Sequence, residues 1–74
     1  MRNNEYSIRN AEKIKRQYRP GTRIRLIAME DPYSPVQPGA LGSVRMVDDW
    51  KIHMEWDNGR TLALVPGVDD FVII

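Results

Sequence analysis

Residues 8–18 place an apolar side chain at every third or fourth position, which is the period of an amphipathic helix. The members of this apolar stripe are Ile8, Ala11, Ile14 and Tyr18. Ser7 is a suitable N-cap, and Pro20 ends the pattern because the residue before a proline avoids helical backbone angles. The sequence therefore predicts a helix from Ser7 to Gln17.

After Pro20 apolar and polar residues alternate, which is the period of a β-strand. Turn residues divide this part into five predicted strands, over 22–28, 41–47, 51–56, 60–65 and 69–74. Their predicted inward residues are Ile24, Leu26, Ala28, Val44, Met46, Ile52, Met54, Trp56, Leu62, Leu64, Phe71 and Ile73. Asn58-Gly59 predicts a two-residue type I′ hairpin, and Gly42 indicates a bend or a close backbone approach.

Short strands, a tight hairpin and a long loop over 29–39 with three prolines together predict a mostly β fold. We expect a small five-stranded SH3-like barrel preceded by one N-terminal amphipathic α-helix, with a five-stranded OB-fold as the competing topology. In this organisation residues 1–19 form the basic helix and residues 20–74 form the barrel domain.

The chain contains no cysteine, so it has no disulfide, thiolate zinc site or cysteine nucleophile. A secreted domain of 74 residues would usually carry disulfides, and the first residues do not resemble a signal peptide. No apolar run is long enough to span a bilayer. We therefore expect a cytoplasmic protein without a membrane partner.

Charge is distributed unevenly along the chain, although the net charge is only +1. Residues 1–25 carry eight basic and two acidic residues, whereas residues 26–74 carry three basic and eight acidic ones. The front of the chain is therefore basic and the predicted barrel acidic, so the two parts favour partners of opposite charge or attract each other.

No arrangement of residues predicts catalysis. His53 is the only histidine and falls on the outward face of its strand, where no motif places a hydroxyl nucleophile beside it. Asp48-Asp49 and Asp69-Asp70 are adjacent pairs, which is not the alternate spacing of a calcium loop. Phosphate-binding glycine loops and zinc signatures are absent from the sequence. We expect a protein that is not an enzyme, with no cofactor and no metal site.

Two aromatic residues favour a protein or peptide partner. Tyr33 lies in the proline loop, and Trp50 lies in the turn between the predicted strands 41–47 and 51–56. Both offer flat amphipathic area beside a predicted groove, and small barrels bind extended peptides in such grooves. Acidic neighbours would favour a basic segment; they are Asp31, Asp48 and Asp49. The same pattern also allows both rings to fold over the core.

A nucleic acid is the alternative partner, because the front of the chain is rich in cations. The candidate phosphate contacts are Arg9, Lys13, Arg16, Arg23 and Arg25. Exposed lysine and arginine residues bind phosphates in a salt-sensitive manner. The acidic barrel opposes this interpretation, since it would repel nucleic acid and attract the helix instead.

Several short motifs occur together over about residues 18–71: Pro20-Gly21-Thr22-Arg23-Ile24, Asp31-Pro32-Tyr33 and Trp56-Asp57-Asn58-Gly59. In this combination the sequence resembles the domain-of-unknown-function family numbered 4314, a set of short bacterial and phage proteins, many of them carried on mobile elements. The resemblance implies a small β-barrel and no assigned activity. A weaker resemblance is to the mind-bomb type of barrel, whose modules bind peptides.

The last four residues, Phe71-Val72-Ile73-Ile74, are apolar on both faces of the predicted final strand. An open strand edge of this kind favours pairing with another chain unless something covers it. Either the basic helix or a second copy covers it, so we expect a monomer or a homodimer.

Overall fold

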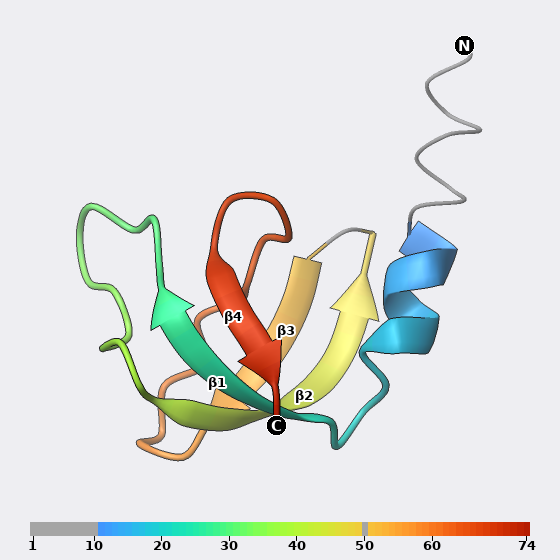
Figure 1. The fold of residues 1–74 in the computed structure, drawn as a ribbon, viewed down its shortest axis with the longest axis horizontal. Helices are drawn as coiled ribbons and strands as arrows, with labels where there is room; N and C mark the ends of the chain where they lie inside the picture. The colour runs from blue at the N-terminus through green and yellow to red at the C-terminus, as the bar shows by residue number, and fades with distance from the viewer. Residues whose placement is uncertain (1–10, 50) are drawn as a thin grey trace, which may run out of the picture.

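The computed structural model describes residues 11–49 and 51–74, which form one short N-terminal helix and a four-stranded antiparallel sheet (Figure 1). The strands are β1 Arg23–Ala28, β2 Leu41–Asp48, β3 Lys51–Trp56 and β4 Asp70–Ile73. Their order is β3-β2-β1-β4, so the last strand pairs with the first. Residues 11–17 are helical, as predicted, whereas the predicted first turn with its cap Ser7 lies outside the described residues.

Three Pro-Gly pairs make the sharpest turns between these elements. They lie in residues 19–22, 37–40 and 65–68, and in each turn the fourth residue donates a backbone hydrogen bond to the first. The glycine of each pair has a φ of about 90°. A proline followed by a residue with positive φ is the pattern of a type II turn. The turns therefore separate the helix from β1, the proline loop from β2, and the segment before β4 from that strand.

The predicted strand over 60–65 is wrong, because this segment forms only an isolated bridge between Ile52 and Leu64. The carbonyl of Leu62, which a ladder would use, instead accepts the indole N–H of Trp56 at 2.8 Å. This hydrogen bond holds the segment close to the Trp56 ring, at a point between the two backbone contacts that the segment makes with β3. Among the described strands no ladder joins β3 to β4, so the predicted five-stranded closure is replaced by a four-stranded sheet.

The hairpin after β3 also differs from the predicted type I′ turn, which needs positive φ at both central residues. Gly59 has φ 92°, but Asn58 is not among the residues with positive φ. The Gly59 N–H donates to the Trp56 carbonyl and the Trp56 N–H donates to the Arg60 carbonyl, both at 2.9 Å. This is the three-residue hairpin in which a type I turn is followed by a left-handed glycine.

Two register shifts change which residues face the core. In β2 the register shifts between Val44 and Met46, so Met46 is exposed and Val47 is buried, opposite to the prediction for Met46. In β1 a shift between Leu26 and Ala28 likewise leaves Ala28 exposed instead of inward. An extra residue in one strand of an antiparallel pair exchanges the two faces beyond it, which strict alternation does not anticipate.

Among the residues that the structure describes, nine buried apolar side chains form the core: Ile24, Leu26, Val36, Val44, Val47, Ile52, Met54, Trp56 and Leu64. Val36 comes from the proline loop, which therefore contributes to the core and is fixed by it. Gly42 permits the close approach of β2 and β3, since a Cβ there would lie 2.7 Å from the Trp56 ring. Ile73, predicted to face inward, is 47% exposed because β4 lies at the edge of the sheet and little covers its end.

The helix end packs on the sheet through its apolar stripe. Ile14 and Tyr18 are partly buried against the core. The Tyr18 ring meets Phe71 of β4 edge-to-face, with centroids 5.6 Å apart. The Gly21 N–H also donates to the Val44 carbonyl at 2.7 Å, which ties the turn after the helix to β2. The apolar side of the described helix is thus directed at the sheet and its charged side at solvent.

Candidate functional site

The residues predicted to contact a peptide fall on two separate parts of the molecule. Asp31 and Tyr33 belong to the loop that follows β1, whereas Asp48 and Asp49 lie where β2 turns into β3. Figure 1 shows this loop at one end of the sheet and the turn toward the other, beside the helix. Trp50 lies outside the described residues. The structure therefore does not bring the described residues of the predicted groove together.

The beginning of the proline loop is shaped by Asp31. Its Oδ1 accepts the backbone N–H of Tyr33 at 2.8 Å and that of Ser34 at 3.3 Å, which is an Asx turn. Farther along, Arg60 donates to the Ser34 carbonyl at 2.5 Å and ties the loop to the hairpin. Tyr33 is 92% exposed, so its ring does not fold over the core and remains available to a partner.

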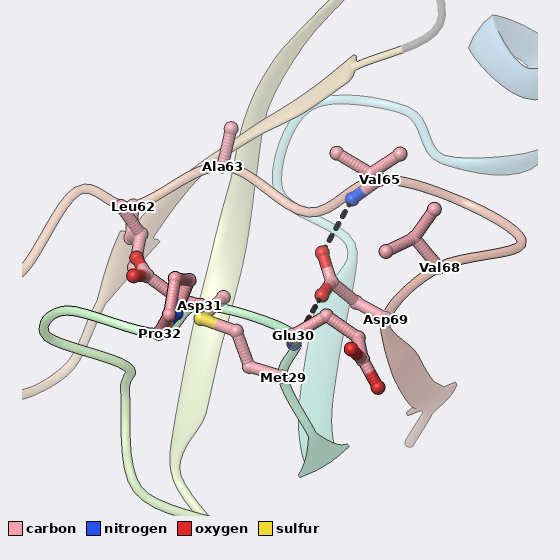
Figure 2. A pocket seen from close by; sticks show the side chains of 9 residues that line it. All are labelled: Met29, Glu30, Asp31, Pro32, Leu62, Ala63, Val65, Val68 and Asp69. Atoms are coloured by element: carbon pink, nitrogen blue, oxygen red, sulfur yellow. Dashed lines mark hydrogen bonds between the residues drawn. The ribbon is translucent and has the colours of Figure 1, made fainter.

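A hollow of about 190 Å³ lies between the start of this loop and the segment before β4 (Figure 2). We call it the acidic hollow. It is lined by Met29, Glu30, Asp31, Pro32, Leu62, Ala63, Val65, Val68 and Asp69. The apolar residues come from both walls, and every charged residue in the lining is an acid. The Asp31 prediction therefore falls in a recessed site, whereas Tyr33 lies just beyond its lining.

Asp69 holds the two walls of the acidic hollow together. Its Oδ1 accepts the N–H of Glu30 and its Oδ2 accepts the N–H of Val65, both at 2.8 Å (Figure 2). Sequence reasoning considered Asp69 only as one member of an adjacent acidic pair and missed this role. The available signal was its position directly after the Pro66-Gly67 turn, where a carboxylate can reach the backbone that enters the turn.

The residues predicted to contact nucleic acid are also divided. Lys13 and Arg16 are exposed on the helix, and Arg25 is exposed on β1. Arg9 lies outside the described residues. Arg23, in contrast, donates two hydrogen bonds to the Asp57 carboxylate, at 2.9 and 2.7 Å, and a third to the Ser43 hydroxyl. Its guanidinium is therefore already bound to the Asp57 carboxylate, which makes it a poor candidate for a phosphate contact.

The Arg23–Asp57 pair has the electrostatics of an exposed two-point ion pair. The hydrogen bond from Arg23 lowers the pKa of Asp57 below its ordinary value of 3.8, and the charge of Arg23 acts in the same direction. The same hydrogen bond raises the pKa of Arg23. Asp57 therefore fixes a β1 side chain to the hairpin.

His53 lies on the open face of β3 and pairs across the strands with Met46. Within residues 11–49 and 51–74 no group of three histidine, cysteine or acidic side chains is arranged to hold a metal ion. In the same part of the chain no helix is long and apolar enough to cross a membrane.

The chain belongs to the family described as domain of unknown function DUF4314, whose model matches residues 8–74. This confirms the resemblance found in the sequence motifs. No curated protein matches the chain. Among solved structures it is similar to part of unliganded Pif1 from Bacteroides sp, with 23% identity and a TM-score of 0.52. The match covers 74% of this chain and 22% of that one, and at this identity it concerns the fold alone.

Proposed function

We propose that this DUF4314 protein is a non-catalytic binding module that holds a basic, extended protein segment in its acidic hollow. The observation that supports this most directly is the composition of the lining, in which three acids surround an apolar floor and no cation takes part. A hollow of this charge attracts a positive side chain and repels a negative one.

Lysine and arginine fit such a hollow because their side chains have two parts. The methylene stem can lie against apolar surface while the charged head reaches a polar rim. Here the stem would contact Met29, Pro32 and Leu62, and the head would meet Glu30 and Asp31. Asp69 is already satisfied by two backbone donors, so its role is to position the walls.

The exposed Tyr33 extends this surface beyond the hollow. An extended segment with one basic side chain in the hollow would pass the ring of Tyr33, which offers apolar area and a hydroxyl. We take the sheet and segment 60–65 together as an SH3-like barrel in this proposal, because small barrels bind peptides between such loops. A cytoplasmic, phage or mobile-element setting belongs to the same proposal.

The test is a titration of ¹⁵N-labelled chain with short peptides that carry arginine or lysine between apolar residues. We expect the largest amide shifts at residues 29–31, 62–65 and 67–69, and none with the acidic counterpart of the peptide. The double variant Glu30→Gln and Asp31→Asn should weaken binding about three- to tenfold, as expected for exposed ion pairs. An asparagine side chain keeps the oxygen that the Asx turn needs, so the loop should stay in place.

The matched control removes the same two charges elsewhere. Asp48→Asn with Asp49→Asn lies in the β2–β3 turn, and asparagine tolerates the φ of 56° found at Asp49. The control should bind the basic peptide like the natural chain. Equal weakening by both double variants would mean that net charge, not the hollow, governs binding, and the proposal would fail.

A further inference from the structure

A second hollow, of about 300 Å³, lies where the helix end meets β2. We call it the helix hollow. It is lined by Lys15, Tyr18, Pro20, Met46 and Val47. Met46 reaches this hollow because the register shift in β2 turns its side chain out of the core. The side chain is 41% exposed. The floor is apolar, one wall is an aromatic ring, and among the described lining residues the only charged one is a lysine.

Cations continue along the chain on both sides of this hollow. Lys13, Arg16 and Arg19 are exposed like Lys15, and over residues 11–19 the only acid is Glu12. In the part of the chain that the structure describes, no ion pair joins these cations to an acid of the sheet. The attraction between helix and barrel that the charge distribution allows therefore leaves these cations without an ion pair to the sheet among the described residues.

The acidic hollow does not cancel this basic surface either. The helix lies at one end of the 39 Å long dimension and the loop of the acidic hollow at the other (Figure 1). Exposed charges are screened over about 8 Å at physiological ionic strength. Besides Glu12, the acids nearest to the lining along the chain are Asp48 and Asp49, which follow Val47 and limit the surface on that side.

The orientation of the helix distinguishes between classes of anionic partner. A helix that lies on a membrane inserts an exposed apolar face into the lipid. Here Ile14 and Tyr18 face the sheet, and Tyr18 packs on Phe71, so the described helix presents its cations to the partner without such a face. A phosphate backbone with flat bases satisfies both the cations and the apolar hollow.

We propose that the helix hollow and its flanking cations bind single-stranded nucleic acid. Lys15, Arg16 and Arg19 contact phosphates, and one base lies in the hollow between Tyr18 and Met46. An unpaired base can leave its stack and lie against an aromatic side chain, whereas a paired base would first have to be unpaired. The site lies at the opposite end of the molecule from the acidic hollow, so the protein can hold a nucleic-acid strand and a basic protein segment at the same time.

Fluorescence anisotropy with a labelled oligo-dT strand, at several salt concentrations, tests this site. The triple variant Lys15→Gln, Arg16→Gln, Arg19→Gln should lose about tenfold or more in affinity at low salt. Its slope of log affinity against log salt should fall by about 2 if each residue meets a phosphate. The control for the loss of one positive charge is Arg60→Gln, at the far hairpin, which is compared with Arg19→Gln alone. Arg60→Gln should leave binding unchanged.

Two further variants address the base in the hollow. Tyr18→Leu keeps an apolar contact with Phe71 but removes the ring, and Met46→Ser changes an exposed side chain on the other wall. Each should weaken oligo-dT binding about fivefold or more without changing the salt slope, since the contact of the base with the hollow involves no phosphate charge. Amide spectra of each variant should show that the sheet is intact.

Three results would overturn the proposal: no binding of oligo-dT at low salt, equal or tighter binding of the matching duplex, or equal binding of heparin with no effect of Tyr18→Leu and Met46→Ser. The last result would show a polyanion surface without a base site. None of these results bears on the acidic hollow, which the peptide titration tests separately.

Discussion

The two hollows differ in what holds their walls in place. The acidic hollow is fixed by the Asp69 carboxylate, which bonds two backbone N–H groups, and its wall continues into the buried Leu64. The helix hollow depends mainly on two partly buried side chains, Ile14 and Tyr18. Regions with few buried contacts open at lower free energy than the core. We therefore expect the helix end to detach from the sheet before the acidic hollow loses its shape.

The largest expected effect is the difference in stability between a variant beside the acidic hollow and a variant that loosens the helix end. Leu64→Ala removes a fully buried side chain and should lower the free energy of unfolding by about 2–5 kcal/mol. Ile14→Ala removes a partly exposed apolar contact and should cost about 1 kcal/mol. Urea unfolding followed by tryptophan fluorescence measures both. Equal losses would show that the helix is held as firmly as the core, and the contrast would disappear.

The next effect concerns the close approach beneath the acidic hollow. In Gly42→Ala the new Cβ would lie 2.7 Å from the Trp56 ring and 3.0 Å from backbone atoms of Glu55 and Trp56. The ring cannot move freely because its N–H is bonded to Leu62, a residue of the acidic hollow. We expect a loss of about 1–3 kcal/mol in thermal or urea unfolding.

The strain from Gly42→Ala should reach Leu62 and leave the helix end unchanged. Amide shifts of 62–65 should move clearly, whereas those of residues 14–18 should not. Ser43→Ala, the neighbouring position on the open face, is the control and loses only one partly exposed hydrogen bond from Arg23. Shifts as large at 14–18 as at 62–65 would mean that the two ends are not mechanically separate.

A smaller effect should follow from releasing the walls of the acidic hollow. Asp69→Ala removes the acceptor of two backbone N–H groups and should lower stability by about 1–2 kcal/mol. Hydrogen exchange should accelerate at the amides of Glu30 and Val65 more than at core amides of β3. Asp70→Ala removes the same charge from an exposed strand position and should leave both amides protected. Protection that survives in Asp69→Ala would contradict the role of this carboxylate.

The smallest effect concerns the ion pair between β1 and the hairpin. Because the folded chain lowers the pKa of Asp57, the ionised carboxylate contributes stability above the ordinary value of 3.8, and this contribution is lost as the pH falls through the lowered pKa. The stability difference between the natural chain and Asp57→Asn should stay constant from neutral pH to about pH 5 and shrink below about pH 4. Unfolding midpoints across this range measure the stability difference. A difference that grows on acidification would contradict a lowered pKa of Asp57 in the folded chain.

Regular alternation made part of the fold predictable. The prediction for β3 matches the observed strand because Lys51–Trp56 alternates without interruption. The two register shifts were not predictable by the same rule, since Met46 and Val47 are both apolar and either fits the core. The strand over 60–65 was overpredicted because local pattern does not show that the Leu62 carbonyl is taken by a distant indole.

The candidate sites divide in the same way. Asp31 and the helix cations were found from residue type and charge, which are local properties. Asp69 and Met46 were missed, because their roles depend on which segments meet in space. Arg23 was assigned to a phosphate, but a residue far along the chain, Asp57, had already satisfied it. Sequence reasoning therefore located the charged regions better than the hollows they surround.

The register shift in β2 also bears on how this strand can change length during evolution. Because the shift lies between Val44 and Met46, deletion of the single codon for Arg45 would restore regular pairing with β3. Met46 would stay opposite His53 on the open face, and Val47 would stay opposite Ile52 in the core. A homologue one residue shorter at this point would thus keep both the sheet and the lining that β2 gives to the helix hollow.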